Sequence, residues 1–337
     1  MNQPASVARP KPVRTPASED VRLALRAATM YHLQGATQAE IAAKLGISRP
    51  TAGRLLARAR SQGLVRVEIA VPAGVEGTVD TELEAKLEDR FGLSEVVVVP
   101  EANSESDEPD YDALGRRAAE VLVRRIQPSS TLGFTWGPET VSVASSLPDK
   151  AAKCSAVVQL DGSMTVTDYQ TGVDFTIGRC AQQLQANPVR LNAPLYADPA
   201  TVESMRNDSV ISKALKSGSD SDIMVFGVGA VSTATTLFAG SFVDATMLDE
   251  LEHLGAVGEI GGRFYTINGD PVEGRLPART VSVSLEAVKS CDQTILVSGG
   301  THKRQAVLGA LRGGLANVLV TDVECGQWLL DAGATVE

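Results

Sequence analysis

The segment TQAEIAAKLGISRPTAGRLLARARSQ, residues 37–62, constrains this chain more than any other part of it. Apolar residues recur at helical spacing on both sides of Gly46, which predicts two short helices joined by a tight turn. Glycine suits that turn because it adopts the left-handed C-cap conformation without steric strain. Ser48 then stands at an N-cap, and Pro50 is accepted in the first turn of the second helix. This pattern is typical of a helix-turn-helix, whose second helix enters a DNA major groove.

An ordinary pair of helices with a solvated basic face is the alternative interpretation of this segment. The flanking sequence argues against it. DVRLALRAATMYHLQG, residues 20–35, predicts a supporting first helix, and Gly63 is expected to end the recognition helix. LVRVEIAV, residues 64–71, alternates apolar and polar side chains as a short wing strand would. The inner face of the supporting helix is expected to hold Val21, Leu25, Ala28 and Leu33.

The charge of the chain is divided unevenly between its two ends. Residues 1–70 hold 11 Lys or Arg and 4 Asp or Glu, a net charge of +7, whereas the whole chain carries −10. Residues 71–337 therefore carry −17. A basic end on an acidic protein attracts a polyanion at that end and repels it elsewhere. We therefore predict that the N-terminal part binds double-stranded operator DNA.

Seven residues of the N-terminal part are candidate DNA contacts. Arg49, Thr51 and Arg54 are expected to read bases, because they project from the first turns of the recognition helix. Phosphate contacts are expected from other positions on the same surface. The full set is Gln38, Ser48, Arg49, Thr51, Arg54, Arg58 and Arg66, with Gln38, Arg58 and Arg66 as the phosphate contacts.

Length and composition limit the class of protein. At 337 residues the chain is expected to form two domains. No run approaches the ~20 apolar residues of a membrane helix, and the first 17 residues lack a hydrophobic signal core, so a cytoplasmic protein with no membrane partner is expected. Three histidines and no CxxC pair predict neither a metal site nor a cofactor. The four cysteines, expected to be reduced thiols, are Cys154, Cys180, Cys291 and Cys325.

The remainder of the chain is expected to be an α/β domain. From about residue 111, helical patterns alternate with short β-branched runs such as SDIMVFGVGA and QTILVSGG. Several of these runs are apolar on both faces, which indicates strands of a mostly parallel sheet covered by helices. The predicted organisation is a disordered arm (1–17), a helix-turn-helix domain (18–72), a linker and connector helix (73–92) and an effector-binding domain (93–337).

Three glycine-containing loops of this domain are candidate binding loops, because ligands of such sheets collect beyond the carboxyl ends of the strands. LGFTWGPET offers hydroxyls, an apolar Trp136 wall and the free amides of a helix start. SGGTHKRQ combines glycines and a lysine, and VGEIGGRFY carries an arginine fork suited to phosphate or carboxylate. The alternatives are a structural turn for the first loop, a solvated helix start for the second and a surface arginine in a hairpin for the third. The candidate effector contacts are Gly133, Thr135, Trp136, Gly137, Arg263, Gly299, Gly300, Thr301 and Lys303.

Taken in order, six blocks of the chain resemble the SorC sugar-binding transcriptional regulators, a family that includes deoxyribonucleoside and central-glycolytic-gene regulators. The blocks are TQAEIAAKLGISRPTAGRLLARARSQGLVRV, GFTWG, VVQLDGS, GVGA, VGEIGGRFY and SGGTHKRQAVLGALRGGLANVLVTD. The resemblance implies a helix-turn-helix followed by an effector domain with a fold like those of ribose-5-phosphate isomerase and glucosamine-6-phosphate deaminase. It also implies homodimers or homotetramers on palindromic operators, and it places effector contacts in the same three loops. Some deoxyribonucleoside regulators bind their sugar on a lysine, but VVQLDGS offers Asp161 instead.

Two classes of function follow from these observations. The favoured one is a transcriptional regulator, expected to be a repressor of carbohydrate genes, controlled by a small sugar, polyol or sugar phosphate, with a phosphorylated effector preferred. The alternative is a sugar-phosphate isomerase or deaminase with an appended DNA-binding head, which needs a positioned acid/base pair. Asp161, Glu259 and Asp322 lie near predicted strand ends, but nothing in the sequence pairs them. We therefore predict no catalytic residues and no enzyme.

Overall fold

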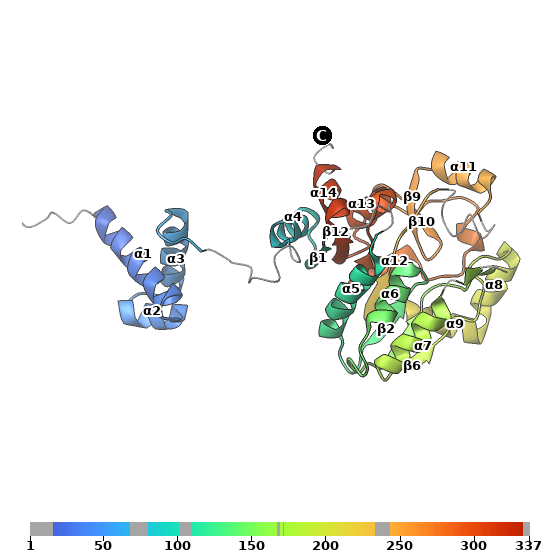
Figure 1. The fold of residues 1–337 in the computed structure, drawn as a ribbon, viewed down its shortest axis with the longest axis horizontal. Coiled ribbons are helices and arrows are strands. Elements are labelled where there is room, and N and C mark those ends of the chain that lie inside the picture. The colour runs from blue at the N-terminus through green and yellow to red at the C-terminus, as the bar shows by residue number, and fades with distance from the viewer. Residues whose placement is uncertain are drawn as a thin grey trace, which may run out of the picture. The chain divides into compact units, whose positions relative to one another are not determined.

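The computed structural model describes residues 16–67, 80–100, 109–166, 169–170, 172–232 and 243–332. The chain divides into two compact units, Met1–Ala73 and Gly74–Glu337 (Figure 1). The predicted disordered arm lies outside the described residues except at its end, because the first helix already begins at Pro16. In the described ranges, no helix is both long enough and apolar enough to span a membrane.

Three helices form the first unit: α1 (Pro16–His32), α2 (Gln38–Leu45) and α3 (Arg49–Ser61). Their shared core is rich in alanine, and such small side chains allow helices to approach closely. The buried residues are Ala24, Ala27, Ala28, Met30, Ile41, Ala42, Ala52, Leu55, Leu56 and Ala59.

One sequence prediction for this unit is wrong, and a second has no support in the part that the structure describes. Leu25 and Leu33 do not line the inner face of α1, because they are 43% and 81% exposed. The alanines of α1 face α3 instead, and Leu33 lies beyond the helix end. The predicted wing strand is absent over its described part, residues 64–67, and the rest of it lies outside the described residues.

A seven-stranded parallel sheet forms the centre of the second unit, in the order β1-β12-β11-β7-β2-β3-β6. This confirms the mostly parallel α/β fold expected from the apolar runs. The strands are β1 (Glu95–Val99), β2 (Thr131–Phe134), β3 (Ala156–Gln159), β6 (Asn187–Val189), β7 (Ile223–Phe226), β11 (Gln293–Val297) and β12 (Val318–Asp322).

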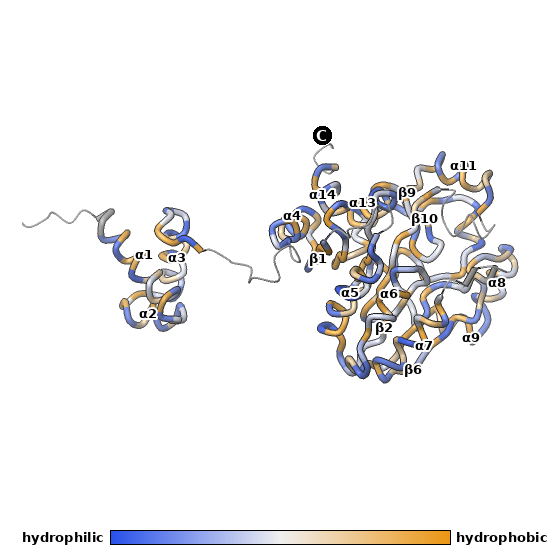
Figure 2. The backbone as a smooth tube through the Cα atoms, viewed as in Figure 1, coloured by the Kyte–Doolittle hydropathy of each residue, from blue (hydrophilic) through white to orange (hydrophobic). Residues whose placement is uncertain are grey.

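Both faces of the sheet are buried, and this explains the continuous apolar runs. In β12, Val318 and Val320 point into one core and Leu319 into the other. The first core lies under α5 (Tyr111–Arg125), α6 (Pro138–Ser146) and α7 (Val173–Gln183), and α5 alternates polar and apolar residues in Figure 2. The second lies under α4 (Thr81–Phe91), α13 (Arg304–Arg312) and α14 (Val323–Ala332).

Smaller elements complete the second unit. A three-stranded antiparallel sheet consists of β8 (Gly229–Ala230), β9 (Ala256–Ile260) and β10 (Arg263–Thr266). The other elements are β4 (Thr165–Val166), β5 (Tyr169–Gln170), α8 (Pro199–Asn207), α9 (Ser209–Ser219), α11 (Ala245–His253), η1 (Pro277–Arg279), α12 (Leu285–Ser290) and η2 (Thr301–Lys303).

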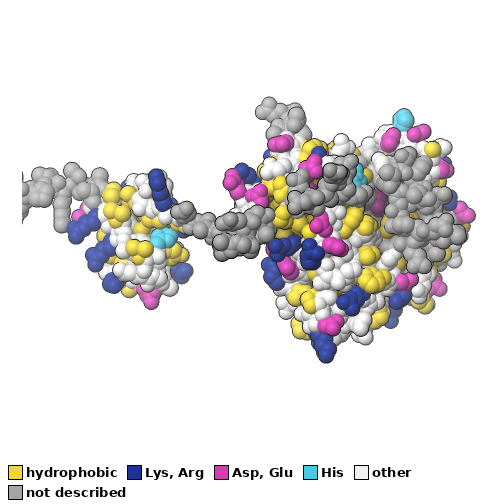
Figure 3. Space-filling view, viewed as in Figure 1, with side chains coloured by type: hydrophobic (Ala, Val, Ile, Leu, Met, Phe, Trp, Pro, Cys, Tyr) yellow, Lys and Arg dark blue, Asp and Glu magenta, His cyan; other side chains and the backbone are white. Residues whose placement is uncertain are grey.

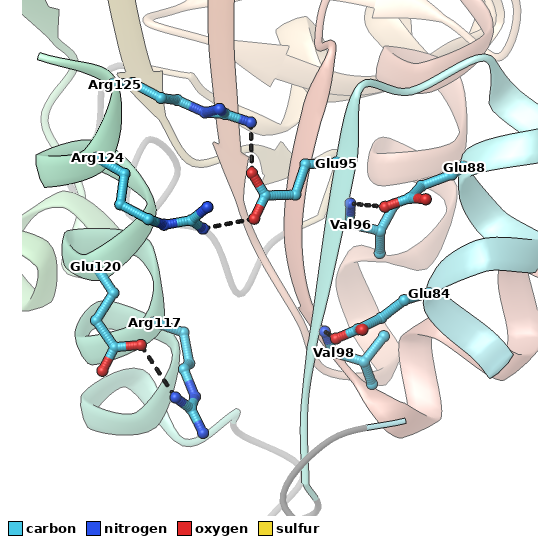
Figure 4. Close-up of polar contacts among 9 residues, drawn as sticks. All are labelled: Glu84, Glu88, Glu95, Val96, Val98, Arg117, Glu120, Arg124 and Arg125. Atoms are coloured by element: carbon cyan, nitrogen blue, oxygen red, sulfur yellow. Dashed lines mark hydrogen bonds and ion pairs between the residues drawn. The ribbon is translucent and has the colours of Figure 1, made fainter. Parts of the chain in front are cut away.

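Side chains of the neighbouring helices close the outer edge of the sheet at β1 (Figure 4). The Val96 amide donates to Glu88 Oε1 at 2.9 Å, and the Val98 amide donates to Glu84 Oε1 at 3.0 Å. Both carboxylates come from α4, so the predicted connector helix packs on its own effector unit. On the α5 side, Glu95 accepts from two arginines, Arg124 and Arg125, at 2.5 Å each.

Candidate functional sites: a DNA-reading helix and a buried acidic cluster

The turn between α2 and α3 has the geometry of a helix-turn-helix. Thr37 caps α2 through a capping box with Glu40, and Gly46 ends the helix at φ 69°, in the left-handed region. Ser48 then caps α3, since its Oγ accepts from the Thr51 amide at 3.3 Å. Each cap satisfies backbone groups that a helix end leaves unpaired, so the sequence of this segment directly specifies its turn.

The structure places six of the seven predicted DNA contacts at exposed positions and Thr51 at a half-buried one. Arg54 donates to Thr51 Oγ1 at 3.2 Å, which holds these two predicted base readers side by side on α3. Arg58 forms an exposed ion pair with Asp20 of α1 at 2.9 Å. Such a pair contributes little to stability and leaves the guanidinium accessible. Lys and Arg side chains are spread over the visible face of this unit in Figure 3.

In the second unit, the chain reverses its direction of travel across the sheet between β2 and β7. From β2 it proceeds to β3 and β6 on one side, and from β7 to β11 and β12 on the other. Crevices at such a switch point, outside the carboxyl ends of the strands, are where open α/β sheets bind ligands. Thr135–Gly137 follow β2 there, and Gly227–Gly229 follow β7.

A cluster of ionisable side chains is buried at these strand ends. It contains Glu139 from α6, Asp161 after β3, Glu259 from β9 and Lys303 from η2, each less than 9% exposed. Lys303 Nζ forms an ion pair with Glu139 Oε1 and lies 5.9 Å from the centre of the Tyr111 ring. Neighbouring backbone amides bind the other two carboxyl groups. We refer to Glu139, Asp161, Glu259 and Lys303 as the acidic cluster.

Glycines make room for the carboxyl groups of this cluster. A Cβ on Gly227 would lie 2.6 Å from Glu139 Oε2, and one on Gly229 would lie 2.2 Å from Glu259 Oε1. Both distances are too short for a side chain, so the GVGA block provides bare backbone beside the cluster.

Burial makes the negative charge of the cluster costly. It raises the pKa of Glu259 to about 7, opposed by a hydrogen bond from the Gly262 amide at 2.6 Å and by the charge of Lys303. Burial also raises the pKa of Asp161 well above its usual range, although the Trp136 amide donates to both of its oxygens at 3.3 Å. The nearby Glu259 contributes to this second shift.

Three polar atoms on the adjoining loops lack a hydrogen-bond partner within the described part of the chain. They are Thr135 Oγ1, Trp136 Nε1 and Ser298 Oγ, and all three residues are buried. Thr135 and Trp136 follow β2, and Ser298 follows β11. Buried polar groups are normally satisfied, so these atoms are candidate ligand contacts.

The predicted role of Arg263 as a free guanidinium fork is wrong. Its guanidinium donates to Ser282 Oγ and to the carbonyl oxygens of Pro277, Thr280, Ser282 and Val283, at 3.0–3.3 Å. Burial lowers the pKa of Arg263 to about 10. The side chain is half-buried and lines a cavity of about 190 Å³ beside α11. It belongs to the β9–β10 hairpin, but it is not the surface arginine of the alternative interpretation.

The SGGTHKRQ loop is also occupied by the protein's own carboxylates. The Gly300 amide donates to Asp322 Oδ2 at 2.6 Å, and a Cβ on Gly299 would lie 2.2 Å from the same oxygen. Arg304 pairs with Glu324 at 2.6 Å, while Thr301 remains half-exposed at the start of η2. The lysine of this loop and its Gly300 amide, which the sequence offered to a ligand, are therefore both bound to carboxylates of the protein.

The two predicted glycines at the end of β2 have different roles. Gly133 lies within β2, where a Cβ would come 2.4 Å from Leu160 Cδ2, so its missing side chain serves packing. Gly137 has φ 139° and opens α6 without a side-chain cap.

The sequence suggested Asp161 and Glu259 only as catalytic groups and did not place Glu139 beside Lys303. The available signals were a carboxylate ending the buried run VVQLD and another inside VGEIGG.

Comparison with known proteins identifies the family. Residues 76–331 match the Sugar-bind profile, which describes a sugar-binding domain, and residues 27–73 match a MarR family profile. The chain belongs to the family of SorC-like sugar-binding transcriptional regulators. This confirms the resemblance seen in the six sequence blocks.

Relatives of known role cover nearly the whole chain. The deoxyribonucleoside regulator of Bacillus subtilis is 31% identical over 93% of this chain and 98% of its own length. The sorbitol operon regulator of Klebsiella pneumoniae is 30% identical over 93% of this chain and 99% of its own. These relatives are transcriptional regulators, and they do not support the enzyme alternative.

Solved structures agree with the sequence relatives. The full-length sorbitol operon regulator SorC from Klebsiella pneumoniae has a TM-score of 0.67 at 30% identity, covering 93% of this chain and all of its own. A DeoR family transcriptional regulator from Listeria monocytogenes has a TM-score of 0.66 at 25% identity, covering 74% of this chain and 98% of its own.

Proposed function

We propose that this SorC-like regulator represses carbohydrate genes by binding operator DNA through α3 and releases or tightens its hold when a small carbohydrate binds beside β2 and β7. The observation that carries the proposal is the combination of two sites in one chain. One is an exposed basic helix behind a capped turn, and the other is a buried polar cluster at the switch point of a sugar-binding domain.

The proposed reading surface consists of Arg49, Thr51 and Arg54, with Gln38, Arg58 and Arg66 on phosphates. An arginine that contacts guanine with two hydrogen bonds contributes ~1–3 kcal/mol to discrimination between bases. The hydrogen bond from Arg54 to Thr51 supports the proposal, because it orders the arginine before DNA arrives.

We further propose that the chain acts as a homodimer or homotetramer. A two-fold dimer presents two recognition helices about one DNA turn apart, ~34 Å, which matches a palindromic operator. A ligand that changes this spacing changes operator affinity, and it can do so only by binding the two arrangements with different affinity.

The experiment uses the full chain and a DNA duplex selected from a random-sequence pool. Arg54→Ala is expected to weaken binding of the selected duplex by roughly tenfold, corresponding to ~1–3 kcal/mol, and to relax preference at one base pair per half-site. Lys44→Ala is the matched control, since it removes one exposed positive charge of the same unit outside the proposed contact set. Equal affinity and equal sequence preference in wild type and Arg54→Ala would exclude this arginine from the reading surface.

A further inference from the structure

We infer that the effector site takes an uncharged polyhydroxyl compound, a free sugar or a polyol, and rejects its phosphate ester. This inference rests on the proposed function, because it concerns the ligand of the same site. It reverses the preference for a phosphorylated effector that the glycine loops suggested in the sequence.

The side-chain cations at the predicted phosphate loops already have partners within the protein. Lys303, the buried cation of the cluster, is paired with Glu139. Arg304 is paired with Glu324, and the guanidinium of Arg263 is surrounded by one hydroxyl and four carbonyl oxygens. A phosphate entering this site would have to displace one of the protein's own carboxylates.

Backbone amides that could hold a phosphate are occupied in the same way. Asp161 accepts from the amide of Trp136, just before the start of α6. Glu259 accepts from the amide of Gly262, and Asp322 accepts from the amide of Gly300. Helix starts and glycine loops bind anions through such amides. Here all three amides already donate to carboxyl groups of the protein itself.

The segments of the second unit that the structure does not describe cannot bring a further Lys or Arg to the site. Residues 68–79, 101–108 and 233–242, which the structure does not describe, contain no Lys or Arg. The short remainders, residues 167–168, 171 and 333–337, contain none either. No arginine or lysine from these segments can therefore add to the charge of Lys303, Arg304 and Arg263.

The cluster itself combines three carboxyl groups with one lysine. A phosphate dianion beside them would be a buried charge without a free cation of the cluster to pair with, because Lys303 is already paired with Glu139, and such a charge is strongly unfavourable in a low-dielectric interior. Carboxylates instead accept hydrogen bonds, and every sugar hydroxyl can donate one. The unpaired Thr135 Oγ1, Trp136 Nε1 and Ser298 Oγ can donate to the hydroxyl oxygens of the same ligand. The site therefore matches a ligand with many hydroxyls and no net charge.

Matched ligand pairs test the inference on the full-length protein. Ribose and ribose 5-phosphate, glucose and glucose 6-phosphate, and sorbitol and sorbitol 6-phosphate are titrated by calorimetry, with inorganic phosphate as a further probe. In at least one pair the neutral member is expected to bind at least tenfold more tightly than its ester, and inorganic phosphate is expected not to bind. Tighter binding of the esters would overturn the inference and leave the proposed function intact. Absence of binding by every member would overturn both, including the effector part of the proposed function.

A charge variant provides a second, independent test. Glu139→Gln keeps the size of the side chain but frees Lys303 to serve an anion, so the affinity for an ester relative to its neutral partner is expected to rise at least tenfold. Glu82→Gln removes the same charge from an exposed pair with Lys86 and is expected to change that ratio by less than twofold. An unchanged ratio in Glu139→Gln would contradict the inference.

Asp161→Asn covers the case in which Glu139→Gln fails to fold. It leaves the size of the side chain unchanged but replaces one acceptor oxygen with an amide, so at least a tenfold weaker affinity for the neutral ligand is expected, without gain for its ester. Unchanged affinity for the neutral ligand would again contradict the inference.

Discussion

At the scale of single residues, the two glycines of the helix-turn-helix have opposite roles. Gly46 has φ 69°, where a side chain is strained, whereas Gly53 lies inside α3 in ordinary helical conformation. A Cβ on Gly53 would be 3.5 Å from Gln38 Oε1, which is an ordinary van der Waals contact.

Gly53→Ala is therefore expected to stabilise the first unit by up to about 1 kcal/mol, the difference in helix propensity. Gly46→Ala is the matched comparison and is expected to destabilise the unit by about 1 kcal/mol. Hydrogen exchange of the α2 and α3 amides in the full chain measures both changes. Faster exchange in Gly53→Ala would show that α3 cannot accept the methyl group.

Glu259 provides a prediction on pH dependence. Its folded-state pKa of about 7 lies above the ordinary glutamate value of 4.5, so the folded protein holds more protons than the unfolded chain between these pH values. The contribution of Glu259 to the free energy of unfolding is therefore fully present below about pH 4.5 and is lost as the pH rises through 7. Glu259→Gln keeps an acceptor for the Gly262 amide and removes the titration.

The free energy of unfolding of wild type minus that of Glu259→Gln is therefore expected to fall between pH 5 and pH 8. Urea unfolding of both proteins over this pH range gives the difference between their free energies of unfolding. Titration of all other groups affects both proteins and largely cancels in this difference. A difference that is flat or rises with pH would show that Glu259 is ionised throughout.

At the scale of elements, β1 illustrates how an edge strand is closed by a neighbouring helix. Its outward amides at Val96 and Val98 donate to two glutamates of α4. Unpaired edge amides favour pairing with another chain, so these carboxylates protect the sheet as well as stabilise it.

Removal of both acceptors is expected to open this edge. The double variant Glu84→Ala, Glu88→Ala should lose about 1 kcal/mol of unfolding free energy for each lost hydrogen bond and should self-associate more readily. Urea unfolding and light scattering are the measurements, with the exposed Glu82→Ala as control. Stability and scattering equal to the control would mean that the two hydrogen bonds contribute nothing.

Most of the elements could be predicted because their signals are local. Apolar runs such as SDIMVFGVGA and QTILVSGG marked parallel strands, and caps such as Ser48 marked helix starts. The small sheet of β8, β9 and β10 was only partly visible, because its strands are short and rich in glycine. Of the four residues predicted for the inner face of α1, Ala28 lies in the core, whereas Leu25 and Leu33 are exposed and other alanines pack there.

The site could be predicted only as far as its loops. Strand ends locate the loops by topology, but ion pairs depend on tertiary contacts that leave no periodic trace. Glu139 and Lys303 lie 164 positions apart in the sequence, and nothing local to either indicates the other. The same reason explains why Arg263 was expected to be free.

At the scale of the whole molecule, charge and chemistry are divided between two units. The basic unit carries exposed arginines on a helix of DNA-reading geometry, and the acidic unit repels polyanions and buries a polar cluster. Regulation by a metabolite requires a coupling free energy between these two sites, and that coupling must act in both directions.

This coupling is tested by the operator affinity of the full chain, measured with and without a saturating carbohydrate that calorimetry shows to bind. The dissociation constant for the selected duplex is expected to change at least tenfold when the carbohydrate is present. A carbohydrate that binds to the protein and leaves the affinity for the operator unchanged would contradict the coupling.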